Sequence, residues 1–375
     1  MTFLMISKRW AFLAATLFSL LLCASAPAED YVPLEDVTKL KRPTLCINRD
    51  GNLRLIDWDG QNERLWMTGN FGSARFSRDG RYAWISAFEN NRYTPFLLEL
   101  ETGRVVNMRE RFDNIGYEHI SISGAWWFPD GRRLACRGKD LNGPNRSQSD
   151  IFLLDLRNEK IKNLTSTPFR DEFWATVSAD GKKIAFNGYP PSEEERAALG
   201  IDHFPDHLYV MSSNGGRAVN LTNSAASYAY PEWSPDGSKI AFEGSGRPVK
   251  EEGEGAGVHI YMINPDGSNL ERLTFPKDGY WANMQDWSGD SKWVLYTMAE
   301  AEAPGSPRSL YRIHIETREI VRIRTPSASS AWVYAGKSRF LSVDPADKKK
   351  AQWGKIKAAD GNENSPAAQE SSPKE

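Results

Sequence analysis

The sequence is poor in cysteine, which limits what covalent crosslinks can contribute to the fold. Three cysteines occur in 375 residues, and Cys23 lies within the N-terminal apolar stretch. Cys46 and Cys136 lie in the apolar stretches TLCIN and RLACRG. In an exported protein these two cysteines could form a disulfide, but one disulfide is too few to act as a framework for the fold. We therefore expect two buried free thiols.

An excess of positive charge is also missing, as is an apolar run long enough to cross a bilayer. The net charge of -2 gives no basic face of the kind that nucleic acid requires, so we expect no nucleic-acid partner. The apolar run from Ala11 to Leu22 has about twelve residues, whereas a spanning helix needs ~20. We therefore expect no stable membrane span.

The N-terminus has instead the pattern of an export signal. Lys8 and Arg9 precede the apolar run, and the small residues of CASAPAED follow it. This order is typical of a signal peptide, here residues 1–28, cleaved after Ala26 or Ala28. An uncleaved anchor is the alternative, and a lipoprotein signal at Cys23 is disfavoured by the large residue before it. We expect a periplasmic or secreted protein with a short leader over residues 29–43.

The motifs of common hydrolases and metal sites are absent as well. The sequence has no G-x-S-x-G, no H-E-x-x-H and no C-x-x-C. The stretch AWVYAGKS resembles a phosphate loop, but Ala331 stands where its first glycine is needed. His203 and His207 flank Pro205, which breaks the helix that would align them on a metal. We expect no cofactor and no metal, and the sequence leaves enzymatic activity open.

What the sequence does contain is an internal repeat of about 50 residues. Each copy reads as a strand, a tight turn, usually Asp-Gly, and a strand, followed by a second such hairpin, as in IFLLDLRNEKIKNLT. Four antiparallel strands repeated radially form a β-propeller. The copies begin at Phe76, Trp127, Val177, Trp233 and Trp287, with a degenerate copy at Val333.

The two ends of the chain set the expected number of blades at six. The degenerate copy, from Val333 to Val343, supplies two inner strands and has no second half. The segment from Pro43 to Trp66 reads as strand, turn and strand, and can supply the outer half. Such pairing removes the free edges of an open ring. We predict an all-β, six-bladed propeller over residues 44–357, closed by N-terminal outer strands on C-terminal inner strands and followed by a disordered polar tail, 358–375.

The Asp-Gly pairs are interpreted as turn residues rather than as a binding site. Sialidase-type Asp boxes separate the two residues by one position, and a single carboxylate per turn is too few for calcium. Aspartate accepts backbone hydrogen bonds in such turns, and glycine adopts positive φ at little steric cost. The predicted turn residues are Asp79, Gly80, Asp130, Gly131, Asp180, Gly181, Asp236 and Gly237.

The repeated signature W-S-x-D-G-x-x-I-A-F, complete from Trp233 to Phe242, resembles that of the TolB-like propeller family. This family includes the C-terminal domain of TolB and the propellers of prolyl oligopeptidases. The resemblance covers roughly residues 44–343, without the N-terminal domain of TolB and without a hydrolase domain. It implies a stand-alone propeller of the cell envelope that receives a protein or peptide at the mouth of its channel.

Propeller topology places the short Asp-Gly turns on one face and the long loops on the other. The long insertions fall at residues 139–149, 188–207, 244–258 and 299–309, and the second should contain a short helix. Loops gathered on one face of a rigid scaffold commonly carry function, although tolerated sequence drift is the alternative. We expect the long-loop face to bind the partner.

Aromatic and acidic residues gather just before the repeated position, in segments that we interpret as crossings into the channel mouth. Aromatic rings at a concave mouth can stack on sugars, grip a peptide or plug the channel. The candidates for partner binding are Trp174, Tyr228, Tyr230, Trp281, Asp171 and Glu172.

Two other functions stay open beside a protein- or peptide-binding module. A carbohydrate-active enzyme could use two of Asp171, Glu172, Glu232 and Asp286 as paired carboxylates. Two carboxylates about 5 to 10 Å apart in an open pocket would favour this enzyme, and a channel filled by Trp and Tyr would exclude it. The third possibility is a structural repeat protein with no small ligand.

Overall fold

The computed structural model describes residues 44–334 except 90, 118–119, 144–147, 166–170, 190–204, 223, 225, 246–256, 276–279, 301–307 and 326–329. Contacts divide the chain into residues 1–340 and residues 341–375, and all described residues belong to the first unit. The predicted signal peptide, leader and polar tail lie outside the described residues. Within the described part, no helix is long and apolar enough to cross a membrane.

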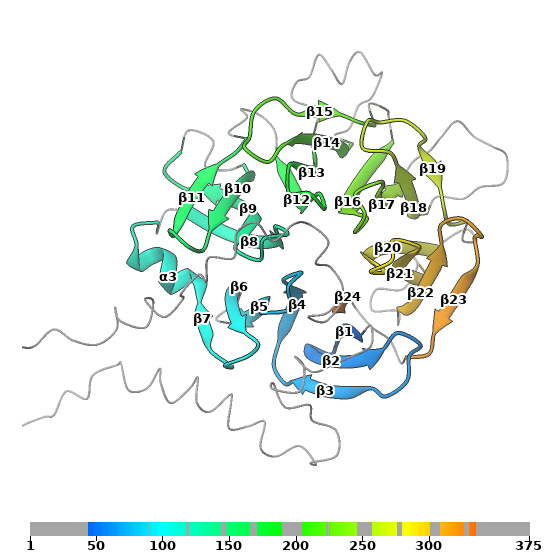
Figure 1. Ribbon diagram of the computed structural model, residues 1–375, viewed down its shortest axis with the longest axis horizontal. Coiled ribbons are helices and arrows are strands. Elements are labelled where there is room, and N and C mark those ends of the chain that lie inside the picture. Colours follow the sequence, from blue (N-terminus) through cyan, green and yellow to red (C-terminus); the bar gives the residue numbers. More distant parts are fainter. Residues whose placement is uncertain are drawn as a thin grey trace, which may run out of the picture. The chain divides into compact units, whose positions relative to one another are not determined.

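Six four-stranded antiparallel sheets surround a central axis, as Figure 1 shows. The fold is a six-bladed β-propeller, which confirms the architecture predicted from the repeat. From the axis outward, the first two complete blades are β4 (Phe71–Phe76), β5 (Tyr82–Glu89), β6 (Arg92–Glu99) and β7 (Val105–Asn107), then β8 (Ile120–Trp127), β9 (Arg133–Asp140), β10 (Asp150–Asp155) and β11 (Lys160–Asn163).

The next three blades repeat this order. They are β12 (Glu172–Val177), β13 (Lys183–Gly188), β14 (His207–Ser212) and β15 (Val219–Asn220); β16 (Ser227–Trp233), β17 (Ile240–Ser245), β18 (His259–Ile263) and β19 (Glu271–Arg272); and β20 (Tyr280–Trp287), β21 (Trp293–Glu300), β22 (Ser309–His314) and β23 (Ile320–Ile323). A short helix, α3 (Met108–Asn114), follows β7, and the Asn107 side chain caps its first turn.

The closing blade joins the two ends of the propeller. Its order from the axis is β24 (Ser330–Tyr334), β1 (Thr44–Arg49), β2 (Asn52–Asp57) and β3 (Arg64–Met67). Closure by outer strands from the N-terminus is therefore confirmed. The N-terminal segment supplies three strands of this blade and the C-terminal segment one, whereas we expected two from each. The cause is the tight turn at Asp50 and Gly51, both at positive φ, which splits the N-terminal segment into one strand more than expected. Thus β1 takes the place expected for the strand ending at Val343.

The first turn of each blade shows why Asp-Gly recurs. In the turn before β13, Asp180 Oδ1 accepts hydrogen bonds from the Ser178 hydroxyl at 2.7 Å and the Lys182 N–H at 3.0 Å. These bonds, the one from Lys182 first, hold the pKa of Asp180 below its usual value. Gly181 has φ +70°, which a residue with a side chain adopts at a cost. The Asp-Gly pairs thus form the turns between first and second strands.

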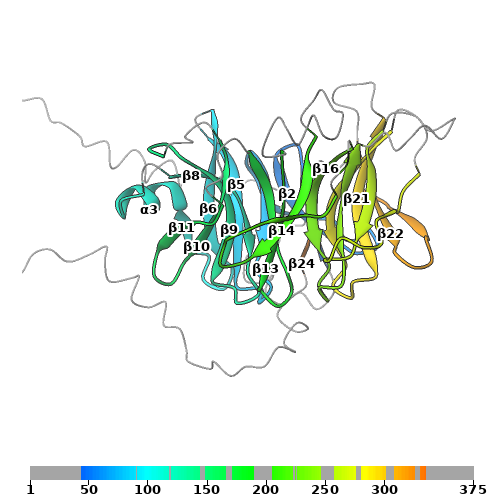
Figure 2. The same ribbon diagram turned by 90° about the horizontal axis from the view of Figure 1, so that it is seen from above.

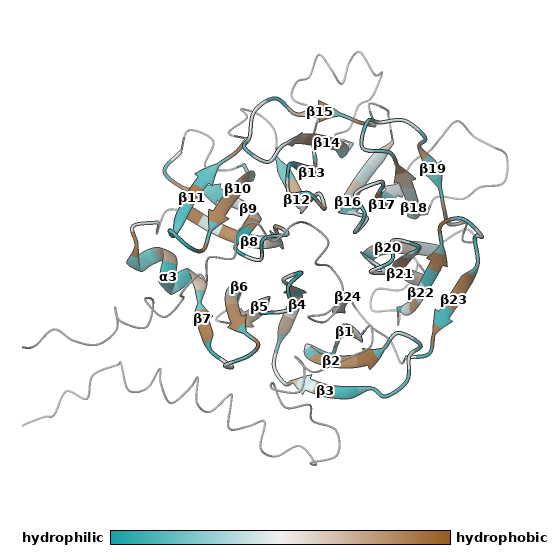
Figure 3. Ribbon diagram, viewed as in Figure 1, coloured by the Kyte–Doolittle hydropathy of each residue, from teal (hydrophilic) through white to brown (hydrophobic). Residues whose placement is uncertain are grey.

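The hydrophobic core lies between neighbouring blades. One cluster joins Trp126 and Phe128 of one blade to Phe186 and Tyr209 of the next. Figure 3 shows the apolar colour on third strands such as β10 and β18, and the polar colour on outer strands such as β11 and β19. Cys46 and Cys136 are buried free thiols, as predicted, and burial raises the pKa of both.

The two faces of the ring differ in the connections they carry. In four of the five complete blades an Asp-Gly turn joins the first strand to the second, whereas the four insertions connect second to third strands, which end on the opposite side of the blade. In the closing blade the Asp50-Gly51 turn also joins the second and third strands. Figure 2 shows the blades edge-on, with β5 rising toward the insertion side, which we call the long-loop face. The short helix expected within residues 188–207 falls outside the described residues.

Trp332→Cys tests the closure, because the register pairs Cys46 of β1 with position 332 of β24. Directly paired antiparallel residues have Cα atoms about 4.5 to 5.5 Å apart, within the range that a disulfide spans. Mild oxidation should link Cys46 to Cys at position 332, and a non-reducing peptide map would detect the link. Val333→Cys, opposite Leu45, is the control and should leave both thiols free. Equal linking of the two variants would contradict the register.

Candidate functional site

The innermost strands carry a bulge on the long-loop side of the axis. In all five complete blades the inner strand has one extra residue in its pairing with the second strand, between Phe71 and Ser73, Ile122 and Gly124, Phe173 and Thr176, Ala229 and Glu232, and Met284 and Asp286. A bulge re-aims the side chains at its site. The aromatic segments that we expected to be crossings are therefore parts of the inner strands, in which the bulge breaks the alternating pattern.

Two aromatic residues occupy the most distorted bulges. Trp174 and Tyr230 have φ of 45° and 55°, in the left-handed region that residues other than glycine seldom adopt. Their rings meet edge to face, with centroids 4.5 Å apart. Such a backbone costs on the order of 1–3 kcal/mol and persists only when its surroundings hold it. The strain places both rings at the axis.

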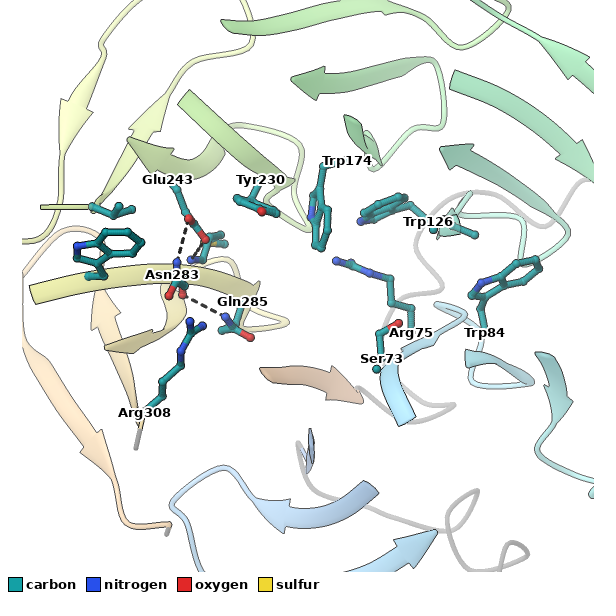
Figure 4. A pocket seen from close by; sticks show the side chains of 16 residues that line it. Ser73, Arg75, Trp84, Trp126, Trp174, Tyr230, Glu243, Asn283, Gln285 and Arg308 are labelled. Atoms are coloured by element: carbon teal, nitrogen blue, oxygen red, sulfur yellow. Dashed lines mark hydrogen bonds between the residues drawn. The ribbon is translucent and has the colours of Figure 1, made fainter. Parts of the chain in front are cut away.

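A cavity of about 490 Å³ opens where these bulges converge. Figure 4 shows Trp174 and Tyr230 between two groups of polar side chains, one around Arg75 and one around Asn283. Tyr230 and Trp281 remain 39% and 46% exposed, so aromatic surface faces solvent at the cavity. The other lining residues are Gly72, Ser73, Trp84, Gly124, Ala125, Trp126, Glu243, Val258, Met284, Gln285 and Arg308.

Glu232 ties the inner strands together beside this cavity. Its Oε1 accepts hydrogen bonds from Arg75 at 2.8 Å and from Trp126 Nε1 at 3.2 Å, and its Oε2 accepts one from the Thr176 hydroxyl at 3.2 Å. Its backbone carbonyl accepts a fourth from Trp287 Nε1 at 2.9 Å. Residues of five different blades are joined by this one glutamate.

Arg75 completes the arrangement by lying against aromatic rings. Its guanidinium carbon lies 4.6 Å from the centre of the Trp126 ring and 5.7 Å from that of Trp174. The ion pair with Glu232 is largely buried, with side chains 15% and 9% exposed. The negative charge of Glu232 is therefore neutralised, and the indole faces beside it are partly covered.

Glu243 is the site residue that sequence reasoning missed. It follows Phe242 on β17, is 8% exposed, and lines the cavity. Its Oε1 accepts a hydrogen bond from the Met284 N–H at 2.8 Å, and its Oε2 accepts one from the Asn283 side-chain amide, Nδ2, at 3.1 Å. Burial raises the pKa of Glu243 to about 7, although the hydrogen bonds from Asn283 and Met284 and the charge of Arg308 oppose the shift.

The sequence did hold a signal for this position. The residue after the apolar triplet of the second strand is polar in every complete repeat, namely Ser86, Arg137, Asn187, Glu243 and Thr297. Three of these side chains reach the bulge of the following blade. Glu243 accepts the Met284 N–H, Asn187 accepts the Tyr230 N–H at 3.4 Å, and the Arg137 guanidinium lies 4.5 Å from the Phe173 ring. These polar residues satisfy or cover the backbone that the bulges disturb.

The structure brings half of the sequence candidates into the cavity. Trp174, Tyr230 and Trp281 line it. Tyr228 does not, because it is buried edge-on against Phe242 and Tyr261 within its blade.

The acidic candidates lie elsewhere. Asp171 Oδ1 accepts the Ser149 N–H at 2.7 Å, Glu172 is fully buried, and Asp286 Oδ1 accepts the Trp287 N–H at 2.8 Å. His207 is buried between Ser224 and Asn220, while His203 falls outside the described residues. No cluster of three potential metal ligands occurs among the described residues.

Glu232→Ala should lower the free energy of unfolding by about 3 kcal/mol or more, because it leaves Arg75 buried without its partner. Urea unfolding measures the change. Asp113→Ala is the matched control, since it removes an exposed ion pair with Arg109 at 3.6 Å and should cost less than ~0.5 kcal/mol. Similar losses in both variants would contradict the role of Glu232.

Glu243 should make stability fall as pH rises. Its folded pKa of about 7 lies above the ordinary value of 4.5, so the folded protein holds a proton that the unfolded chain has released. Stability from this group is complete below pH 4.5 and is lost toward pH 7, by roughly 3 kcal/mol in total. Glu243→Gln should lack this component when urea unfolding is compared at pH 5 and pH 8. Identical pH dependence in both proteins would contradict the assignment.

Known proteins resemble this chain in sequence over about half to two thirds of its length. An uncharacterised protein of Agrobacterium fabrum is 28% identical over 247 residues, covering 66% of this chain and 72% of the relative. The uncharacterised peptidase YuxL of Bacillus subtilis is 24% identical, covering 51% of this chain and 32% of YuxL. TolB of the Tol-Pal system of Francisella tularensis is 25% identical, covering 63% of this chain and 48% of TolB. No protein-family profile matches the chain.

Solved structures extend the likeness over more of the fold. TolB from Acinetobacter baumannii superimposes with a TM-score of 0.54 at 17% identity, covering 78% of this chain and 65% of TolB. A structure assigned to TolB of Agrobacterium tumefaciens gives the same TM-score and identity, covering 78% of this chain and 97% of that one. This chain therefore spans less than half of YuxL and of the Francisella TolB, but nearly all of the Agrobacterium structure. With its six four-stranded blades, the chain is a TolB-like β-propeller.

Proposed function

We propose that this chain is an exported propeller of the cell envelope that binds a protein or peptide at the cavity on its long-loop face. The observation that carries the proposal is exposed aromatic surface at and beside the cavity. Tyr230 and Trp281 line the cavity and are about two fifths exposed. Large side chains held in contact with water by a rigid scaffold are typical of interaction sites.

A second pair of exposed rings lies on the blade of β4 to β7, which contributes Gly72 to the cavity but does not neighbour the blades of Tyr230 and Trp281. Phe88 and Tyr93, near the tip of the β5–β6 hairpin, meet edge to face at 5.1 Å and are 37% and 58% exposed. Gly72, which lines the cavity, lies against Tyr93, since a Cβ there would come within 2.6 Å of its ring. Exposed rings on separate blades around one cavity suit a macromolecular partner better than a small molecule enclosed by the cavity.

A carbohydrate-active enzyme is less well supported. Among the described residues that line the cavity, Glu243 is the one carboxylate, whereas glycoside hydrolysis uses two. Of the acidic residues suggested by the sequence, Glu232 is neutralised by Arg75. Sugar stacking needs free ring faces, but Arg75 lies over Trp126 and Trp174, and Tyr230 abuts Trp174.

The envelope location in this proposal rests on the N-terminal pattern and on the TolB relatives. Residues 1–28 read as a signal peptide, and TolB is named as a component of the Tol-Pal system. Export brings the chain into the compartment where an envelope partner could reach the long-loop face.

Trp174→Gly with Tyr230→Gly should abolish partner binding while preserving the fold. Glycine accepts the positive φ of both positions, so the rings are removed without adding backbone strain. We expect the wild-type protein to capture specific proteins or peptides from native envelope. The amount of each that the double variant captures should be at least tenfold lower. Phe275→Ala, which removes a ring that is 67% exposed and does not line the cavity, is the control and should retain them. Recovery of the same partners by the double variant would show that the cavity is not the binding site.

A further inference from the structure

Two arginines line the cavity, and only one of them is in an ion pair with a described residue. Arg75 is paired with Glu232 and lies against Trp126. Arg308, just before β22, is exposed and makes no ion pair or side-chain hydrogen bond with the described residues. Arg308 is therefore the cationic group of the cavity that is available to a ligand.

Glu243 lies near Arg308 but does not pair with it. Both of its carboxylate oxygens already accept hydrogen bonds, one from Asn283 and one from the Met284 N–H. Burial raises its pKa to about 7, so near neutral pH a large fraction of Glu243 is protonated and carries no charge. The positive charge of Arg308 is consequently only partly balanced from within the cavity.

Two buried polar atoms in the cavity wall have no hydrogen-bond partner among the described residues. Trp84 is 1% exposed, and its Nε1–H donates to no acceptor among the described residues. Asn283 Oδ1 is also buried and accepts no hydrogen bond there, although the Nδ2 of the same side chain donates to Glu243. An unsatisfied buried polar atom costs about 1–3 kcal/mol, which a ligand with matching groups could recover. In Figure 4 Trp84 and Asn283 lie on opposite sides of the cavity, with Trp174 and Tyr230 between them.

We infer that the cavity binds a peptide carboxylate at Arg308, with an adjoining apolar side chain against Trp281 and Tyr230. This inference rests on the proposed function and specifies the ligand class. A guanidinium presents two parallel N–H groups that match the two oxygens of a carboxylate. Asn283 Oδ1 would accept a peptide N–H, and the Trp84 Nε1–H would donate to a peptide carbonyl farther along the cavity.

The chemistry of the wall favours a peptide over other anions. Phosphate sites commonly combine several donors or cations, whereas Arg308 is the one unpaired cation among the described lining residues. An anionic sugar would need open ring faces, and of the cavity's exposed rings Trp281 is the one without a described stacking neighbour. A donor at one side, an acceptor at the other and apolar rings between them match the alternating groups of an extended peptide.

A random hexapeptide library in two forms, with free and with amidated C-termini, tests the inference. Each form is passed over the immobilised mature protein, and the retained peptides are sequenced by mass spectrometry. If the carboxylate is the C-terminus, the free form should be enriched at least tenfold; if it is a side chain, Asp or Glu should be enriched in both forms. Arg308→Gln should abolish the enrichment and Arg308→Lys should keep part of it. Arg157→Gln, an exposed arginine on the turn between β10 and β11, should keep all of it.

The outcomes separate this inference from the function on which it rests. Peptides retained without preference for a carboxylate, and equally by Arg308→Gln, would overturn the carboxylate site but leave peptide binding intact. Peptides retained no better by the wild type than by Trp174→Gly with Tyr230→Gly would overturn both. Arg308-dependent binding of a uronic-acid disaccharide, with no peptide retained, would also overturn both and identify an anionic sugar as the ligand.

Discussion

The hydrogen bonds and ion pair of Glu232 are the constraint on which the centre of this propeller depends. Each blade pairs its strands internally. Neighbouring blades are joined at their inner strands by backbone hydrogen bonds, such as Tyr228 N–H to the Asp206 carbonyl at 2.7 Å and Ala282 N–H to the Val258 carbonyl at 2.8 Å, and by side-chain contacts across the axis. The Glu232 carboxylate accepts hydrogen bonds from Arg75, Trp126 and Thr176. Its backbone carbonyl accepts one from Trp287. An unpaired buried charge is costly, so loss of either Arg75 or Glu232 would destabilise the other. The contacts of Glu232 fix the inner strands from which the cavity is built.

The cavity lies where bulges interrupt the pairing of the inner strands. Each complete inner strand bulges on the long-loop side, and side chains such as Asn187 and Glu243 from the preceding blade satisfy the displaced backbone. The bulges at Trp174 and Tyr230 retain unfavourable φ angles. Local strain balanced by specific neighbouring groups is common where a protein must present side chains to a ligand. The bulges and the side chains that satisfy them therefore stabilise the ring and expose its aromatic surface.

The repeat predicted the architecture well and the site only in part. Asp-Gly turns and alternating strands are local signals, so blade number, ring closure and the two faces could be predicted from them. The three-to-one closure was not predicted because the segment before Trp66 contains two turns, at Gly51 and Gly60, whereas the expected strand, turn and strand have only one. Tyr228 and Tyr230 are two residues apart, yet one is buried and one faces the cavity, because a bulge follows Ala229. Glu243 and Arg308 lie near each other only because the ring brings their two blades side by side, and no local sequence pattern encodes this arrangement.

The central claim is that a partner chain occupies the cavity at the axis in the cell. Site-specific photocrosslinking tests it most directly, with benzoylphenylalanine in place of Trp281, a ring that lines the cavity and is 46% exposed. Illumination of living cells should give a discrete crosslinked protein or peptide, whereas the same probe at Phe275, away from the cavity, should give none. No adduct from position 281, or identical adducts from both positions, would contradict the account.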